Sequence, residues 1–344
     1  MCRHKLRLFK VWRSSVRTFL TITAVAISIA ASILPVDCHA QWPGTTRGSD
    51  HGNWLEIGGR AYSRPGTDAD IPLITDADTG QTLFTAGQAT NAGSAPGLEI
   101  SFGFEGKKYD RQWEFRTVIA EFDTETNVPG PNLESPLFPG EGVFGFDYQY
   151  DSRLLSFELN SWRTLAPGIR FSSGPRYLSL NDTATTDLSS AVATAPTPGA
   201  PFIPLNTVAS QEATNGLIGL QAGLDLRFQV SQQIYTRGFI RTGGFYNPTE
   251  VTSTVESFSN GTLFDSEPVT RETKSTGSFL AEIGGRLYVD LYEDAVSGYV
   301  GYEATWIDGI ALAPPAFLGD GTSGVDTANT LFFHAITFGL RMDF

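Results

Sequence analysis

Hydrophobic and polar residues alternate along the last part of the chain, residues 330–344. Counting back from the end in steps of two gives one apolar face with a single exception, His334. The residues between are polar or small apart from Phe333. A period of two is that of a β-strand with one apolar and one polar side. At this length the segment predicts a tilted strand that could cross a bilayer and that ends at Phe344.

The same alternation recurs through most of the chain after residue 53. It covers residues 54–61, 98–105, 113–119, 144–150, 155–159, 169–180, 218–230, 234–246, 279–291 and 300–306. Long and short connections alternate between these segments except across residues 163–214, which indicates a strand missed or split there. Because single-chain bacterial barrels have an even number of strands, we expect about twelve. The predicted fold is all-β, a single antiparallel transmembrane β-barrel with long polar loops on one side and short turns on the other.

The long connections are rich in Pro, Gly, Thr, Asp and Ala, a composition that does not bury enough apolar surface for a separate domain. They lie at residues 63–96, 124–141, 182–214, 248–276 and 310–329. We expect them to be surface loops. Within the first of them, residues 71–75 and 81–84 are predicted to form a short hairpin.

Alternation alone is compatible with a soluble β-sandwich or a lipocalin-like carrier, so other features must decide between these folds and a membrane barrel. After the first 40 residues the only lysines are Lys107, Lys108 and Lys274, all in turns or loops, whereas solvated strand faces usually carry more. Aromatic residues also stand near the segment ends, where interfacial girdles would lie. They are Trp54, Tyr62, Trp113, Tyr150, Trp162, Tyr246, Trp306 and Phe344. These observations favour the membrane barrel.

Residues 1–40 differ from the rest of the chain. A basic stretch up to Arg17 precedes an apolar run from Phe19 to Leu34, and small residues end at Ala40. This pattern predicts a cleaved signal peptide at 1–40 and a barrel at 41–344. An uncleaved anchor is the alternative, although the run is short for a membrane helix. A lipoprotein site at Cys38 is less favoured.

Removing the leader changes the chemistry that the chain can perform. The formal charge of −13 becomes about −18, and both cysteines leave with the leader. The remaining histidines are His51 and His334, and no nucleophile motif is present. We therefore expect no enzyme activity, no cofactor and no metal. An acidic exported protein without a polybasic stretch is also not expected to bind nucleic acid.

Short motifs spread over most of the chain resemble the beta-barrel porin-7 family of planctomycete-type bacteria. They are Asp70-Ile-Pro-Leu-Ile-Thr75, Gly97-Leu-Glu-Ile-Ser-Phe-Gly103, Trp113-Glu-Phe-Arg116, Ser156-Phe-Glu-Leu-Asn160, Gly174-Pro-Arg-Tyr-Leu-Ser-Leu-Asn-Asp182 and His334-Ala-Ile-Thr-Phe-Gly-Leu340. The resemblance implies an outer-membrane barrel and names no substrate. A terminal strand closing on an aromatic residue also resembles that of bacterial outer-membrane barrels, which implies that the barrel-assembly machinery recognises Phe344.

Charged residues in the polar phase are the candidate lumen site. We predict a network of Glu114, Arg116, Glu158, Asn160, Asp225, Arg227, Glu282 and Arg286, with Arg176 as a further candidate. Since polar groups inside a barrel must be paired, the network is either structural or selective for solutes. His334 falls in the apolar phase, which favours packing or lipid contact over catalysis. Residues 76–80 resemble half a calcium loop without its distal glutamate, which favours a solvated turn.

The sequence thus predicts an outer-membrane protein in contact with lipid and the assembly machinery. A porin-like passive channel for small solutes is the first functional hypothesis, with cation preference expected from the negative charge. The alternatives are a structural or adhesive surface barrel with a plugged lumen and, less favoured, an outer-membrane enzyme. Oligomeric state is left open.

Overall fold

The computed structural model describes residues 52–66, 72–106, 111–135, 142–193, 202–266, 269–292, 295–313 and 327–344. The predicted signal peptide at 1–40 and His51 lie outside the described residues. The elements are β1 (Trp54–Arg64), β2 (Pro72–Asp76), β3 (Thr82–Thr85), α2 (Ala86–Ala89), β4 (Gly93–Gly106), β5 (Arg111–Glu134), β6 (Gly142–Ala166), β7 (Ile169–Ala193), β8 (Phe202–Gln229), β9 (Ile234–Ser259), β10 (Thr262–Ser266), β11 (Thr270–Tyr292), β12 (Val296–Ile310) and β13 (Asn329–Asp343). No helix among the described residues is long and apolar enough to span a membrane.

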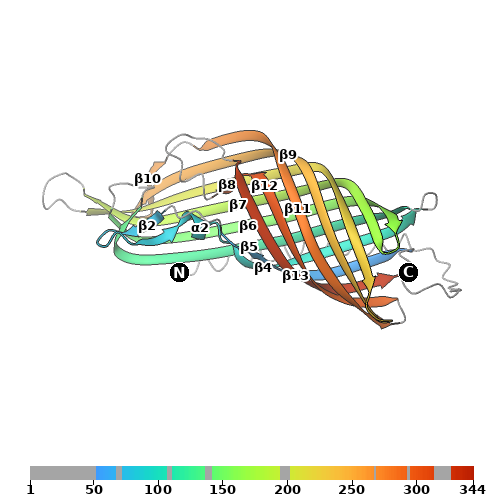
Figure 1. Cartoon of the computed structure of the whole chain (residues 1–344). Helices are drawn as coiled ribbons and strands as arrows, with labels where there is room; N and C mark the ends of the chain where they lie inside the picture. Colours follow the sequence, from blue (N-terminus) through green and yellow to red (C-terminus); the bar gives the residue numbers. More distant parts are fainter. Residues whose placement is uncertain are drawn as a thin grey trace. The chain divides into compact units, whose positions relative to one another are not determined.

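Ten strands close a ring by antiparallel pairing, in the order β1-β4-β5-β6-β7-β8-β9-β11-β12-β13 (Figure 1). Strand β1 completes the ring because Trp54 is paired with Gly103 of β4 on one side and with Asp343 of β13 on the other. The predicted all-β antiparallel barrel is confirmed. The estimate of about twelve strands lies between the ten of the ring and the thirteen of the whole described sheet.

Strand β1 begins and strand β13 ends at the same rim of the barrel, which we call the terminal end. There the backbone N–H of Asn53 donates to the carbonyl of Phe344 over 3.1 Å, and the N–H of Phe344 donates back over 2.9 Å. The opposite rim is called the extended end, because β5 to β9, of 24 to 28 residues, continue beyond β1, β4, β12 and β13, of 11 to 15 residues.

The extended strands correct the expectation of long surface loops. Large parts of residues 124–141, 182–214 and 248–276 continue as paired strand, for example with Thr185 opposite Ser210 and Gln211 opposite Ser253. Their Ser- and Thr-rich composition is compatible with strand because these residues pair across neighbouring strands. The hairpin expected at residues 71–75 and 81–84 is confirmed as β2 and β3, with Ile74 opposite Phe84.

Strand β6 explains why the sequence suggested a split strand. Its apolar residues occupy even positions from Phe146 to Tyr150 and odd positions from Leu155 to Leu159, so the pattern appears to belong to two strands. The structure shows one strand whose even positions face inward from Phe146 to Trp162, with Tyr150 and Asn160 both buried. The environment changes instead: near the terminal end the outside is apolar and the inside polar, and at the extended end the reverse holds.

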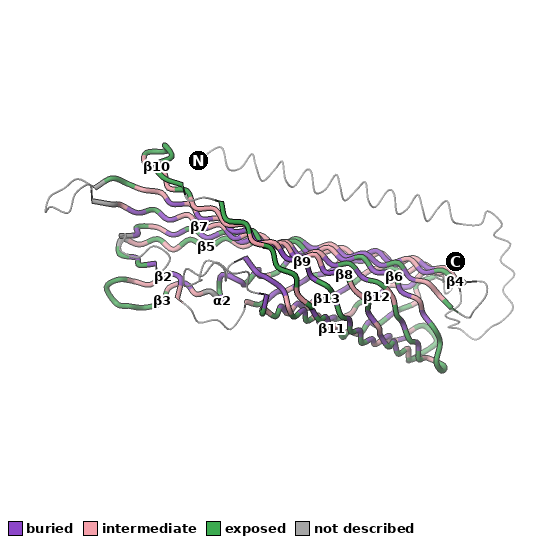
Figure 2. Tube along the Cα trace, turned by 90° about the horizontal axis from the view of Figure 1, so that it is seen from above, coloured by how far each residue is buried: buried purple, intermediate pink, exposed green. Residues whose placement is uncertain are grey.

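An apolar belt surrounds the ring on its outer face at the terminal half. Leu220 of β8 is 70% exposed, Leu291 of β11 61% and Phe338 of β13 53%. Figure 2 shows the accompanying alternation of buried and exposed residues along the strands. An exposed apolar band of this kind is the lipid-facing surface of a transmembrane barrel.

The predicted aromatic girdle is only partly correct. Tyr246 and Trp306 face outward and are exposed, and Phe344 is exposed at the terminal rim. In contrast, Trp54, Tyr62, Tyr150 and Trp162 are buried inside the barrel, at most 5% exposed. These four residues occupy inward positions of their strands. Alternation along the strand decides which way a side chain points, and closeness to a strand end does not change this.

Candidate functional site in the barrel interior

Charged side chains fill the middle of the barrel and form what we call the charged layer. It consists of Glu56, Arg60, Glu99, Glu114, Arg116, Glu158, Arg170, Arg176, Asp225, Arg237, Arg241, Glu282, Arg286, Glu303 and Arg341. Each of these residues is on an inward position of a ring strand, because side chains alternate across a sheet. Eight arginines against seven carboxylates leave this interior nearly neutral, so the negative charge of the chain lies elsewhere.

Arg116 of β5 is at the centre of the charged layer. Its Nε donates to Glu99 over 2.7 Å, its Nη1 to Glu158 over 3.1 Å and its Nη2 to Glu303 over 3.2 Å. These carboxylates come from β4, β6 and β12, so one guanidinium joins opposite sides of the ring. The fixed fork of donors makes arginine suited to such multiple contacts.

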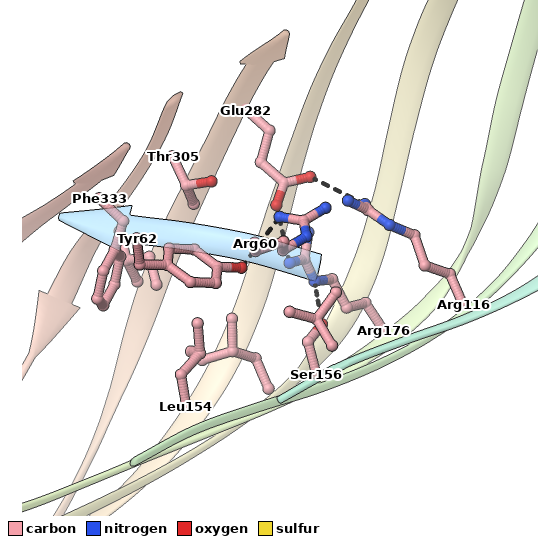
Figure 3. Close-up of a pocket in the computed structure, with 12 residues that line it drawn as sticks. Arg60, Tyr62, Arg116, Leu154, Ser156, Arg176, Glu282, Thr305 and Phe333 are labelled. Carbon is pink, nitrogen blue, oxygen red and sulfur yellow. Dashed lines mark hydrogen bonds and ion pairs between the residues drawn. The ribbon is translucent and has the colours of Figure 1, made fainter. Parts of the chain in front are cut away.

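Arg286 and Arg60 extend the layer on the other side of the ring. Arg286 of β11 contacts Glu56 at 3.0 Å, Glu99 at 2.7 Å and Glu303 at 2.5 Å. Arg60 of β1 contacts Glu99 at 2.6 Å and Glu303 at 2.7 Å. Figure 3 shows Arg60, Arg116 and Arg176 converging with Glu282 inside the barrel. Every one of these carboxylates has an arginine partner, as buried charges require.

The structure places six of the eight predicted network residues in this layer, and a seventh, Asn160, is hydrogen-bonded to it. Asn160 donates to Glu114 and Glu158 over 3.3 Å each, and Arg176 donates to Glu282 over 2.9 Å. Asp225 is paired with Arg237 and, at 3.3 Å, with Arg170. Arg227 is the exception, since its guanidinium lies 3.9 Å from the ring centre of Tyr235, nearer the terminal end.

The predicted network lacked eight members of the layer: Glu56, Arg60, Glu99, Arg170, Arg237, Arg241, Glu303 and Arg341. Two of them, Arg237 and Arg241, are on β9. Both occupy inward positions of residues 234–246, where Thr and Gly on the outer face blur the alternation that would have identified them. Arg241 is also the least well paired member: its closest carboxylates, Glu282 and Glu114, lie at 3.7 and 3.9 Å. Contacts of this length are those that a water molecule bridges.

An aromatic layer lies between the charged layer and the terminal end. Tyr235 and Tyr288 stack at 4.6 Å, and Tyr299 packs 5.3 Å from Tyr288. Arginines cover the neighbouring indoles, with Arg170 over Trp162 at 5.0 Å and Arg341 over Trp54 at 4.6 Å. Stacked cation–π contacts of this type close the space between the strands.

A second ion pair lies on the other side of the charged layer. Arg64, the last residue of β1, donates to both carboxylate oxygens of Asp182 on β7 over 3.2 Å. Ser152 and Tyr150 of β6 complete the group, donating to Asp182 over 2.6 and 2.7 Å. Both charged residues are fully buried. The pair therefore fastens the end of β1 to the far wall of the barrel.

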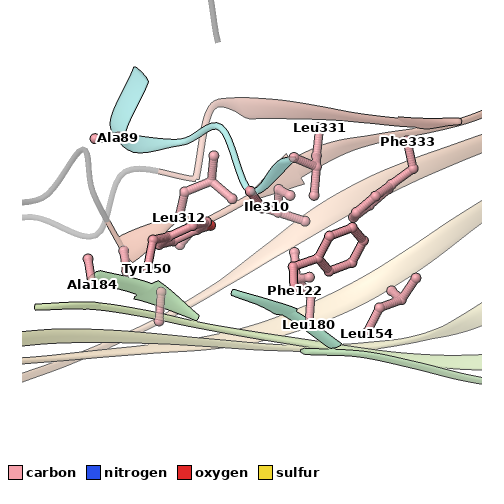
Figure 4. Close-up of a cluster of buried hydrophobic side chains, with 14 of the residues drawn as sticks. Ala89, Phe122, Tyr150, Leu154, Leu180, Ala184, Ile310, Leu312, Leu331 and Phe333 are labelled. Carbon is pink, nitrogen blue, oxygen red and sulfur yellow. The ribbon is translucent and has the colours of Figure 1, made fainter. Parts of the chain in front are cut away.

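An apolar cap closes the extended end above this ion pair. Figure 4 shows Ile310 and Leu312 lying between Ala89 of α2 and the wall residues Leu180 and Ala184. All five are buried in one cluster. The spaces between the layers include two cavities of about 10 Å³ each, one beside Arg60 and Arg176, the other beside Glu56 and Arg237. Each holds about one water molecule.

The other candidates from the sequence are also placed. His334 faces outward, its ring 5.9 Å from Tyr302 and 5.7 Å from Phe332, in the apolar belt. Asp76 accepts backbone N–H bonds from Asp78 and Thr79 over 2.9 Å each. The bond from Thr79 lowers the pKa of Asp76, as in a solvated turn. The described residues contain no cluster of three or more metal-binding side chains.

Comparison with known proteins gives no assignment by sequence. No family model matches the chain, so the resemblance to the porin-7 family stays a prediction. No curated protein matches it either. Among solved structures, it is similar to the outer membrane protease OmpT of Escherichia coli, with 11% identity, TM-score 0.39, and 88% of this chain and 99% of that chain covered.

Two further similarities are of the same kind. A FadL homologue of Pseudomonas aeruginosa has 8% identity and TM-score 0.32, with 85% of this chain and 90% of that chain covered. The translocator domain of the autotransporter NalP of Neisseria meningitidis has 10% identity and TM-score 0.34, with 97% and 99% covered. Similarities this weak do not assign an activity to the chain.

Proposed function

We propose that the protein is a closed outer-membrane β-barrel that presents its extended strands at the cell surface and does not conduct solutes passively. The apolar belt supports membrane insertion. The single observation that carries the closed state is the charged layer, in which Arg116 and Arg286 tie strands on opposite sides of the ring together.

In the porin-like channel predicted from the sequence, the ion pairs of the charged layer would have to separate to let a solute pass. Separating Arg116 from its three carboxylates would leave buried charges unpaired, which costs several kcal/mol per ion. The aromatic layer, the Arg64–Asp182 pair and the apolar cap lie above or below it along the barrel, so a solute would have to pass them as well. Packing in all four layers therefore favours the surface scaffold over the channel, and the near-neutral interior gives no basis for cation selectivity.

Planar-bilayer recording tests the proposal. Purified protein, refolded in detergent and checked by heat-modifiable migration on a gel, should insert without discrete current steps. Proteoliposomes should also fail to swell in isosmotic sugar, while liposomes with a general porin swell. Reproducible unitary openings from the wild-type protein would contradict the closed barrel and restore the channel hypothesis.

The absence of enzyme activity stays a prediction, as does recognition of Phe344 by the assembly machinery. Removing Phe344 would also remove the two backbone hydrogen bonds that join it to Asn53.

A further inference from the structure

The segment 310–313 starts at Ile310, the last residue of β12, and continues through Ala311, Leu312 and Ala313 across the inner face of neighbouring strands. We call this segment the strap. Gly309 makes the turn with φ of +81°, a conformation that favours glycine, and a Cβ there would lie 2.6 Å from the carbonyl oxygen of Gly277. All four strap residues are at most 2% exposed.

The strap is held by side chains that imitate a neighbouring strand. Asn215 of β8 accepts the N–H of Ala311 over 2.9 Å and donates to the carbonyl of the same residue over 2.7 Å. This is the pair of bonds that one strand residue exchanges with another. Asn247 of β9 donates to the carbonyl of Gly309 over 3.1 Å, and Ser278 of β11 donates to it over 2.6 Å.

The two asparagines form a built site and are not surface residues. Both are fully buried, and Asn247 donates to Asn215 over 3.1 Å while accepting the N–H of Gly216 over 3.2 Å. Their orientation is therefore fixed before the strap is added. The cup beside them is apolar, with Leu180 and Leu217 from the wall and Leu331 from β13.

We propose that the extended end contains a binding site for an extended apolar peptide, and that the strap occupies this site as an internal ligand. Asn215 recognises a peptide backbone through its N–H and C=O, which is independent of side-chain identity. The cup selects large apolar side chains in alternation with small ones, as in Ile-Ala-Leu-Ala. A peptide of this chemistry would compete with the strap for the same contacts. The site does not depend on whether the barrel conducts.

The proposal predicts that a displaced strap leaves a functional site behind. Leu312→Asp places a charge in the apolar cup and should expel the strap. In fluorescence anisotropy, detergent-refolded Leu312→Asp protein should bind a labelled, end-capped Gly-Ile-Ala-Leu-Ala peptide at least tenfold more tightly than wild type. Adding Asn215→Leu should abolish the gain. Leu263→Asp, on the exposed β10, is the matched control and should behave as wild type.

Hydrogen exchange gives a second readout if Leu312→Asp does not fold. In Asn215→Ala, the amide of Ala311 should exchange at least tenfold faster than in wild type, while amides of β12 at the terminal end keep their protection. Folded Leu312→Asp protein without peptide binding would overturn the proposal. So would unchanged exchange at Ala311 in Asn215→Ala, because the strap would then be held independently of the asparagine.

Discussion

Single buried arginines determine how this barrel is closed. Arg64 lies at the end of a short strand and has two bonds to Asp182, one to Ser152 and one to Tyr150. Desolvating both charges is costly, so the pair stabilises the barrel only because its bonds are nearly all formed. The pair also sets position, since it fixes the end of β1 against β7 across the lumen.

Removing one partner of this pair should be far more harmful than removing both. Asp182→Asn leaves a buried unpaired guanidinium, and we expect it to lower the free energy of unfolding by about 3–5 kcal/mol. The double variant Arg64→Met/Asp182→Leu should recover much of that loss. Urea unfolding in detergent micelles, followed by tryptophan fluorescence, measures both.

The exposed pair of Arg153 and Glu121 is the control, because both side chains are about half exposed at a separation of 3.5 Å. Arg153→Met should change stability by less than about 1 kcal/mol. If Asp182→Asn is no worse than Arg153→Met, the Arg64 pair does not hold β1 in place.

Within each strand, alternation was a good guide to the side that a residue faces and a poor guide to the environment there. The inward position of Glu114, Arg116, Glu158 and Asp225 follows from parity alone, and the structure places all four inside. The change of environment along β6 cannot be seen from parity, because it depends on where the membrane ends and the cap begins. Asn215 contacts Ala311 of the strap, which is 96 residues away in the sequence, and a local pattern of residues cannot predict such a contact.

Glycines on inward positions of the strands make room for aromatic rings from nearby strands. A Cβ on Gly58 of β1 would overlap the Tyr299 hydroxyl and the carbonyl oxygen of Phe338, and one on Gly103 of β4 would overlap the indole of Trp54. Covering a glycine with an aromatic ring is a known means of stabilising sheets. The Gly-rich polar face is therefore part of the aromatic layer.

Gly58→Ala should consequently disturb the seam between β1 and β13. We expect a lower yield of heat-modifiable folded protein and a midpoint of unfolding at lower urea, because the backbone of Phe338 must move. Gly244→Ala is the matched control, since a Cβ there meets nothing within 4 Å. Equal yields for the two variants would show that the strands β1 and β13 can accommodate a methyl group at position 58 without loss of folding.

For the molecule as a whole, the same strands face lipid in one half and water in the other. On β8 the outward residues Leu220, Leu224 and Phe228 are exposed and apolar, whereas Glu212, on the same face of the same strand, lies beyond the belt. The interior changes in the opposite sense, from the charged layer to the apolar cap. In the closed barrel that we propose, the interior is therefore packed both within the membrane and beyond it.

The position of that boundary can be tested on β8 alone. An arginine at the bilayer midplane on the lipid face costs about 2–4 kcal/mol, and the cost falls to near zero at the interface. Leu224→Arg should therefore destabilise the barrel by that amount in urea titrations in lipid vesicles, and Glu212→Arg by less than about 1 kcal/mol. The two positions share strand, face and substituent, and they differ in depth and in the residue replaced. Similar losses at both positions would mean that the apolar belt does not contact lipid at Leu224, and that the barrel is not inserted as its outer surface indicates.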